Sequence, residues 1–144
     1  MKKALPLLGM FAVLWAATTT SAQQLPRATF NSIFPAGGQQ GASVDVTVAG
    51  GDLDGANLLV FSHAGIKAVP KKDANGKAVA NQYTVTIAKK VPVGIYDAQV
   101  GGGQFGISNV RAFAVGDLPE ARSTAGATLD KAMEVKLGTT INGQ

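Results

Sequence analysis

The residues Val91-Pro92-Val93-Gly94-Ile95-Tyr96-Asp97-Ala98-Gln99-Val100 decide the fold. A proline and a glycine turn the chain, and a tyrosine then begins a segment in which apolar and polar residues alternate. Because strand side chains alternate between two faces, Tyr96, Ala98 and Val100 are expected to point inward. A tyrosine at such a turn tucks its ring into the core and hydrogen-bonds back across the corner of a β-sandwich. This stretch therefore predicts an all-β sandwich with Tyr96 at a corner.

Short segments with strand character, separated by turn residues, continue along the chain on both sides of this corner. Their lengths and spacing, with almost no helical periodicity, predict about seven strands, the number in an immunoglobulin-like sandwich. The segments expected to form strands are residues 29–34, 43–49, 58–61, 66–69, 83–87, 96–100 and 107–115.

The alternation within these segments predicts which side chains enter the core. In residues 29–34, Phe30 and Phe34 are expected on one face and Ile33 on the opposite face. The uninterrupted apolar run at residues 58–61 is typical of a strand that is buried on both faces. Segments 43–49 and 83–87 alternate most clearly, and the inward residues expected there are Val44, Val46, Val48, Tyr83, Val85 and Ile87.

Glycine and proline residues mark the turns between the expected strands. Residues 35–38, Pro-Ala-Gly-Gly, are expected to form a loop that uses the conformational freedom of glycine. Residues 73–76, Asp-Ala-Asn-Gly, have the composition of a hairpin turn. Pro70 is expected to end a short edge strand at residues 66–69, because proline has no backbone N–H to donate.

The first residues of the chain have the pattern of a secretory signal peptide. Lys2 and Lys3 form a basic region, residues 4–17 are apolar, and Thr20-Ser21-Ala22 supplies small residues before a cleavage site at Gln23. The apolar run is too short, and wrongly flanked, for a stable membrane span. We therefore predict cleavage after Ala22 and a secreted, periplasmic or cell-surface protein, with an uncleaved N-terminal anchor as the alternative.

Charge and cysteine content exclude several classes of function. The formal net charge of +4 comes from 13 Lys+Arg and 9 Asp+Glu; without Lys2 and Lys3 it becomes 11 − 9 = +2. The remaining positive charges are scattered, apart from lysine doublets at residues 71–72 and 89–90, so no nucleic-acid partner is expected. The chain has no cysteine, which excludes disulfides and thiolate zinc sites.

His63, the one histidine of the chain, is the first candidate for catalysis. A histidine base needs a nucleophile and an orienting acid held in geometry, and only Ser62, Ser108 and Asp97 could be considered for these roles. Ser62 is adjacent to His63 in a strand, so its side chain points the other way. We therefore expect His63 to pack on Phe61 or to cap a turn, and we predict that the protein is not an enzyme.

Two glycine-rich loops suggest ligand sites and are more simply explained by turns. Asp52 and Asp54 supply too few oxygen atoms for calcium, and Asx turns explain them better. Residues 101–106, Gly-Gly-Gly-Gln-Phe-Gly, are followed by a strand and not by the helix that a phosphate loop needs, so they are expected to be a hairpin. Phe105 is the one aromatic residue expected to be exposed. We predict no metal, cofactor or catalytic residue.

Four blocks of sequence carry a family resemblance: SIFPAGGQQG (residues 32–41), FSHAGI (61–66), PVGIYD (92–97) and FGISNVRAFAVGDLPE (105–120). Together, over about residues 25–120, the chain resembles the IPT/TIG-type immunoglobulin-like domain at the N-terminus of secreted multidomain proteins of planctomycete-type bacteria. The resemblance implies a sandwich of the E-set type, followed by a β-rich domain of the pre-peptidase C-terminal kind. Residues 121–126 depart from the acidic, asparagine-containing linker that usually introduces that domain.

The predicted organisation is a signal peptide at residues 1–22, a linker at 23–27, an immunoglobulin-like domain at 28–117 and a tail at 118–144. Residues 134–141 are expected to be the incomplete first strand of a following β-domain, and Asn142-Gly143 is a hairpin-turn signal. Such a tail is disordered, adds to another sheet edge, or belongs to a longer protein; disorder is our expectation.

Together these features predict a secreted or cell-surface, non-catalytic interaction or spacer module. Its partner would be a protein or an extracellular polysaccharide. The alternative is an accessory domain of an exported hydrolase that binds substrate or carbohydrate while another domain carries the catalysis. The sequence does not predict the ligand or the oligomeric state.

Overall fold

The computed structural model describes residues 25–123, 128 and 131–143, so the predicted signal peptide and its cleavage site lie outside the described residues. The described residues contain no α-helix, and none of their segments is a helix long and apolar enough to cross a membrane. The strands are β1 (Thr29–Phe34), β2 (Gly37–Gln39), β3 (Ser43–Gly51), β4 (Leu58–Phe61), β5 (Ile66–Lys72), β6 (Ala78–Ile87), β7 (Gly94–Gly101), β8 (Arg111–Gly116), β9 (Glu120–Arg122) and β10 (Thr140–Asn142).

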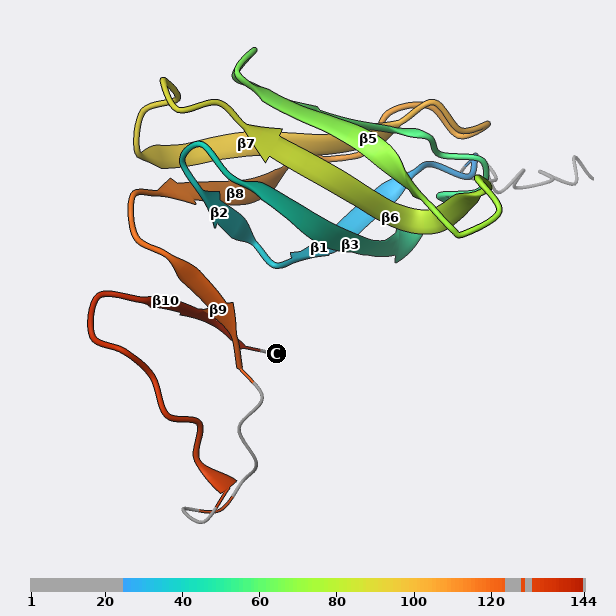
Figure 1. Ribbon diagram of the computed structural model, residues 1–144. Coiled ribbons are helices and arrows are strands. Elements are labelled where there is room, and N and C mark those ends of the chain that lie inside the picture. The colour runs from blue at the N-terminus through green and yellow to red at the C-terminus, as the bar shows by residue number, and fades with distance from the viewer. Residues whose placement is uncertain (1–24, 124–127, 129–130, 144) are drawn as a thin grey trace, which may run out of the picture.

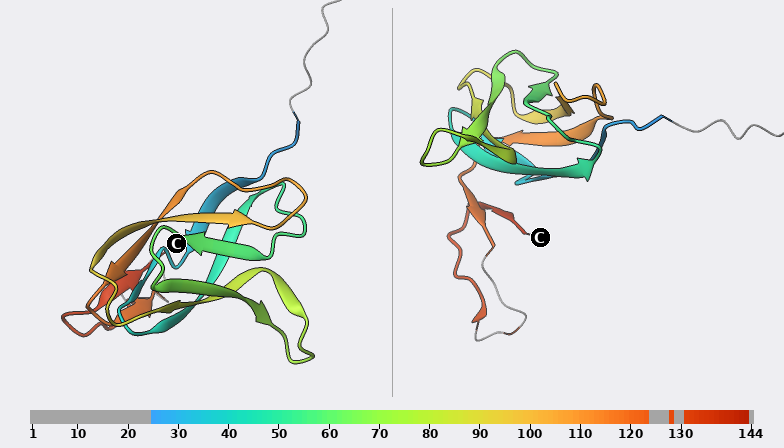
Figure 2. Two further views of the ribbon diagram at one scale, coloured as in Figure 1. Left: turned by 90° about the horizontal axis from the view of Figure 1, so that it is seen from above. Right: turned by 90° about the vertical axis from the view of Figure 1, so that its right-hand side faces the viewer.

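Eight of these strands form two four-stranded sheets that pack face to face as a β-sandwich (Figures 1 and 2). One sheet has the order β1-β3-β6-β5 and is antiparallel throughout. The other has the order β2-β8-β7-β4, in which β2 runs parallel to β8 and the other pairs are antiparallel. The predicted all-β sandwich is therefore confirmed.

The core lies between the two sheets and is made of alternate residues of their strands. On β6, Tyr83, Val85 and Ile87 are at most 1% exposed, as the alternation predicts. On β3, Val46 and Val48 are buried while Val44 is partly buried against them. Each such aliphatic or aromatic side chain contributes about 1.5–3 kcal/mol through burial. The sandwich can therefore be stable without the disulfides that a cysteine-free chain lacks.

Strand β1 differs from the prediction in which residues it buries. Phe30 and Ile33 are both in the core, although simple alternation places them on opposite faces. The pairing of β1 with β3 shifts register between Phe30 and Ser32, which is a β-bulge. The extra residue of a bulge reverses the alternation beyond it, so the expectation for Ile33 was wrong.

Residues 35–38 are not the glycine loop that the sequence predicts. Gly37 and Gly38 begin β2, which pairs with β8, and neither has a positive φ. A Cβ on Gly37 would collide with the carbonyl oxygen of Ala114, and one on Gly38 would lie 2.7 Å from Cδ1 of Ile87. Glycine is required at position 37, because β2 there approaches the backbone of β8 closely.

Other strands also differ from their predicted extent or burial, among them β6, which begins at Ala78 and not at Tyr83. β4 has the predicted bounds but buries only one face, because Leu59 is 4% exposed while Leu58 is 53% and Val60 42%. β5 continues through Pro70 to Lys72, with an irregular register between them. The strand predicted at residues 107–115 begins only at Arg111.

The hairpin turn predicted at residues 73–76 is confirmed. The Asp73 carboxylate oxygen Oδ1 accepts hydrogen bonds from the backbone N–H groups of Asn75 and Lys77, both at 2.9 Å. Gly76 has φ of +79°, the left-handed conformation that glycine adopts at no steric cost. The turn joins β5 to β6 at the edge of the first sheet.

The tail contains a strand, shorter than residues 134–141, and this strand has a partner. β10 pairs in parallel with β9, so that Thr140 lies opposite Glu120 and Asn142 opposite Arg122. The Asn142 side chain also donates to the Glu120 carboxylate at 2.9 Å. The β9–β10 ribbon projects from the sandwich (Figures 1 and 2), and its pairing differs from the unpaired strand that the sequence suggests.

Candidate functional site

Tyr96 occupies the corner between β6 and β7, as predicted. Its hydroxyl donates a 2.7 Å hydrogen bond to the backbone carbonyl of Pro92, four residues upstream. Its ring packs partly against the core and remains half-buried, whereas Ala98 and Val100 are fully buried. The corner hydrogen bond is therefore confirmed, but it lies nearer to solvent than the sequence suggests.

His63 caps the turn between β4 and β5. Its Nδ1 accepts a 3.0 Å hydrogen bond from the N–H of Gly65, which confirms the predicted capping role. The imidazole and the Tyr96 ring pack in a T-shaped arrangement, with centroids 5.3 Å apart. Phe61, the other packing partner suggested by the sequence, contacts the ring of Phe113 at 5.0 Å.

The two serines considered with His63 both form hydrogen bonds to backbone groups. Ser62 Oγ accepts a 3.0 Å hydrogen bond from the N–H of Asp97. Ser108 is buried; its Oγ accepts from Val100 N–H at 3.0 Å and donates to Asn109 O at 2.8 Å. These side chains hold strands and turns together through hydrogen bonds to the backbone.

The acidic loop after β3 borders a hollow of ≈ 460 Å³ at one end of the sandwich. Asp52 and Asp54 line it together with Asn57 and Asn81, and the turn is closed by Ala56 N–H donating to the carbonyl of Leu53 at 2.9 Å. Among the residues that the structure describes, no three His, Cys, Asp or Glu side chains are grouped closely enough to hold a metal ion.

The glycine-rich loop after β7 is a tight turn, as predicted, in which Gly103 and Gly106 form a β-bridge. Gly102 and Gly106 both have φ of +80°, which a non-glycine residue would adopt only with strain. Phe105, however, is half-buried and packs against the core, so the expectation that it is exposed was wrong.

The two outer faces of the sandwich differ in chemistry. The outward residues of the central strands of the first sheet are mainly polar: Asp45, Thr47, Gln82, Thr84 and Thr86. In the second sheet, β4, β7 and β8 present five outward apolar residues that we call the apolar outer face: Leu58, Val60, Ile95, Ala112 and Ala114. Gln99 of β7 lies opposite Val60 on the same side. Ile95 is 76% exposed, and the one charged residue among these outward positions is Asp97.

Sequence reasoning missed this face because it placed both faces of the apolar run at residues 58–61 in the core and assigned no face to Ile95. A local signal exists in β7: Ile95 and Tyr96 are adjacent, so only one of them can face inward. The exposure of Leu58 and Val60 depends on the absence of a second layer over β4, which no local pattern encodes.

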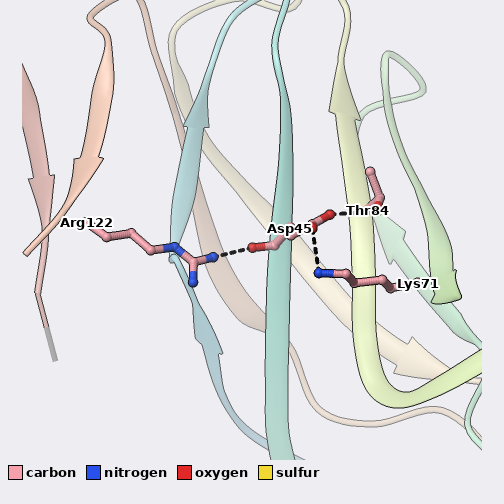
Figure 3. Close-up of polar contacts among 4 residues, drawn as sticks. All are labelled: Asp45, Lys71, Thr84 and Arg122. Atoms are coloured by element: carbon pink, nitrogen blue, oxygen red, sulfur yellow. Dashed lines mark hydrogen bonds and ion pairs between the residues drawn. The ribbon is translucent and has the colours of Figure 1, made fainter. Parts of the chain in front are cut away.

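On the polar outer face, Asp45 joins three elements (Figure 3). Its carboxylate forms a 2.7 Å ion pair with Lys71 of β5 and accepts a 2.7 Å hydrogen bond from Thr84 Oγ1 of β6. Its backbone carbonyl accepts a 2.6 Å hydrogen bond from Arg122 of β9, whose guanidinium lies 5.4 Å from the Phe34 ring centroid. Asp45 and Arg122 are 77 residues apart.

The hydrogen bonds from Lys71 and Thr84 hold the pKa of Asp45 below its ordinary value of 3.8. A lowered folded-state pKa adds stability above the unfolded-state pKa, and this contribution disappears as the pH falls through the folded-state value. Because the Asp45 side chain is 47% exposed, Asp45→Asn is expected to cost under about 1 kcal/mol at neutral pH.

Urea denaturation at several pH values would measure this contribution. The gap between wild type and Asp45→Asn should close as the pH falls below 3.8. Thr47→Asn, an exposed change on the same sheet face that alters no ionisable group, is the control and should leave the pH dependence unchanged. A gap that persists undiminished in acid would contradict the role assigned to the carboxylate.

Comparison with known proteins assigns no family to the chain. No family model matches the sequence, and no curated protein is significantly similar to it.

Proposed function

We propose that the chain is a secreted or cell-surface, non-catalytic interaction and spacer module with an immunoglobulin-like fold of the IPT/TIG type. The strand order supports the fold. In immunoglobulin constant domains the first, second, fifth and fourth strands form one sheet, opposite the third, sixth and seventh. When β1 and β2 are counted as two halves of a first strand, β1-β3-β6-β5 and β2-β8-β7-β4 follow this order. Tyr96, near the start of β7, supports the same assignment.

The observation that carries the interaction role is the apolar outer face. Exposed apolar side chains that are scattered singly need no explanation, but Leu58, Val60 and Ile95 share one face with Ala112 and Ala114. The opposite outer face, built from strands of the same sandwich, is polar. The difference indicates that one face is kept for contact with another macromolecule.

The signal-peptide pattern and the roles of the polar residues support the other parts of the proposal. Lys2, Lys3 and the apolar residues that follow favour export. His63, Ser62 and Ser108, the side chains first considered for catalysis, hydrogen-bond to backbone groups of the turns and strands. These polar side chains stabilise the sandwich itself, which fits a module that binds a partner or separates neighbouring domains.

The interaction role can be tested with the processed chain immobilised and exposed to the extracellular protein fraction of the producing cells. We expect wild type to retain a partner protein, Ile95→Asp to lose it, and Thr47→Asp to keep it. Thr47 is the matched control because it is exposed on the polar outer face. No retention by wild type, or equal retention by both variants, would argue against a partner at the apolar outer face.

The hollow beside β3 favours a second candidate, a carbohydrate-binding accessory domain. Carboxylates and carboxamides such as those of Asp52, Asp54, Asn57 and Asn81 hydrogen-bond well to sugar hydroxyls. Affinity electrophoresis in gels containing soluble polysaccharides would test it. Retardation of wild type and of Ile95→Asp, but not of Asn57→Ala, would favour this candidate over a protein partner.

A further inference from the structure

The two sheets of the sandwich have four edge strands, and three of them carry features that discourage pairing with another chain. At β1, the backbone N–H of Phe30 donates to Asn109 Oδ1 at 2.8 Å. The Phe30 carbonyl accepts from Asn109 Nδ2 at 2.9 Å and from Arg111 Nε at 2.7 Å. The edge groups of Phe30 are thus already bonded within the chain.

The edges at β5 and β2 are protected in other ways. β5 contains Pro70, which has no N–H, an irregular register after it, and three lysines at positions 67, 71 and 72. Proline, irregularity and lysine are the devices by which sheet proteins prevent edge-to-edge pairing. β2 has only three residues, and proline at position 35 precedes it.

Strand β4 lacks these devices. Its sequence, Leu58-Leu59-Val60-Phe61, contains no charge, proline or glycine, and its register with β7 is regular. The N–H of Ser62, just after β4, donates to the backbone carbonyl of Asp97 in β7 at 2.9 Å. Since successive residues direct their backbone groups to opposite sides, the N–H and C=O groups of Leu59 and Phe61 point away from β7, toward the open edge.

We infer that β4 is the edge at which a second copy of this chain adds, antiparallel and about a two-fold axis. One register uses all the outward-directed N–H and C=O groups of Leu59 and Phe61. It places Leu59 opposite Phe61 of the second copy and the two Val60 residues opposite each other. The N–H and C=O groups of Leu59 and Phe61 then bond in both directions across the axis. The two β2-β8-β7-β4 sheets become one continuous sheet.

Charge and side-chain pattern identify a second copy as the occupant. In antiparallel self-pairing, the residue on the two-fold axis faces its own copy, and charges close to the axis lie near like charges of the partner. β4 has none, whereas β5 would bring its lysines together. In the register about Val60, outward side chains lie beside outward ones, and the apolar outer faces of the two copies join. The inference rests on the proposed interaction role and specifies its partner.

Sedimentation equilibrium of the processed chain tests the pairing. A contact along one short strand is small, so we expect a weak dimer with a dissociation constant on the order of 0.1 mM. Val60→Lys places two ammonium groups directly opposite and should raise that constant at least about tenfold. Val69→Lys, at 60% exposure on edge strand β5, is the matched control and should leave it unchanged.

A cross-linking experiment tests the register. Because the chain has no cysteine, Val60→Cys can form a disulfide only between two molecules. Opposed residues of a non-hydrogen-bonded antiparallel pair have Cα atoms about 4.5 Å apart, within the range that a disulfide spans. Under mild oxidation Val60→Cys should cross-link well before Val69→Cys, and equal rates for the two would overturn the register.

The outcomes separate this inference from the proposed function. Wild type that remains monomeric up to about 1 mM, well above the expected dissociation constant, would overturn pairing at β4. If that monomer still retained a partner protein in an Ile95-dependent manner, the interaction role would stand. Equal weakening of the dimer by Val60→Lys and Val69→Lys would place the contact elsewhere and also reject the inference.

Discussion

Phe113→Ala is expected to lower the free energy of unfolding by about 3–5 kcal/mol, the cost of emptying a buried aromatic site. Phe113 lies at the centre of β8, is 0% exposed, and packs against the Phe61 ring at 59°. Small domains are stable by roughly 5–15 kcal/mol in total, so this change removes a large part of the stability. Urea denaturation followed by far-ultraviolet circular dichroism would measure it.

The control for Phe113 is Ile95→Ala on the apolar outer face. Ile95 is 76% exposed, so its truncation should change the free energy of unfolding by no more than about 0.5 kcal/mol. The two variants differ in whether the side chain lies between the sheets or outside them. If both variants lost the same free energy of unfolding, the Phe113 side of β8 would not face the core between the sheets.

Tyr96→Ala should cost about 2–3 kcal/mol, less than a fully buried ring, because the Tyr96 ring is half-buried at the corner. Tyr96→Phe keeps the ring and removes only the 2.7 Å hydrogen bond to Pro92, for which about 1 kcal/mol is expected. Trp15 is the one tryptophan of the sequence and lies in the predicted signal peptide. In the processed chain the fluorescence of Tyr83 and Tyr96 can therefore be used to follow unfolding.

The difference between the two Tyr96 variants distinguishes ring packing from the hydrogen bond. His63→Ala is a third variant for this comparison. It removes the imidazole that packs against the Tyr96 ring, with centroids 5.3 Å apart, and so measures what that ring contact contributes to stability. If Tyr96→Ala melted as wild type does, the corner would be dispensable, and the best sequence argument for the fold would fail.

The sequence predicted those parts of the fold that local chemistry determines. The bounds of β1 and β4 match, the Asp73 turn is a hairpin, and the inward residues of β6 are the alternating apolar ones. In each case neighbouring residues suffice to specify the structure. The Tyr96 corner belongs to the same class, because the proline and glycine that shape it lie within four residues.

The features that the sequence did not predict depend on residues distant in the chain. Ile33 enters the core because a bulge against β3 changes the register of β1. Gly37 is required by the closeness of Ala114, which lies 77 positions later. Leu58 and Val60, central to the candidate interaction surface, are exposed because nothing covers the outer side of β4 in the described structure. Such effects follow from packing between elements.

The parallel pairing of β2 with β8 has a mechanical consequence. The chain enters at β1 and leaves after β8, and these points lie toward opposite ends of the sandwich (Figure 1). Ala114 N–H donates to Ala36 O at 2.8 Å, and Gln40 N–H donates to Gly116 O at 2.9 Å. Tension between the two ends pulls β2 and β8 in opposite directions along their lengths and loads these bonds together, in shear. They must break nearly at once, so the sandwich resists extension where a hairpin pulled from one end would unzip bond by bond.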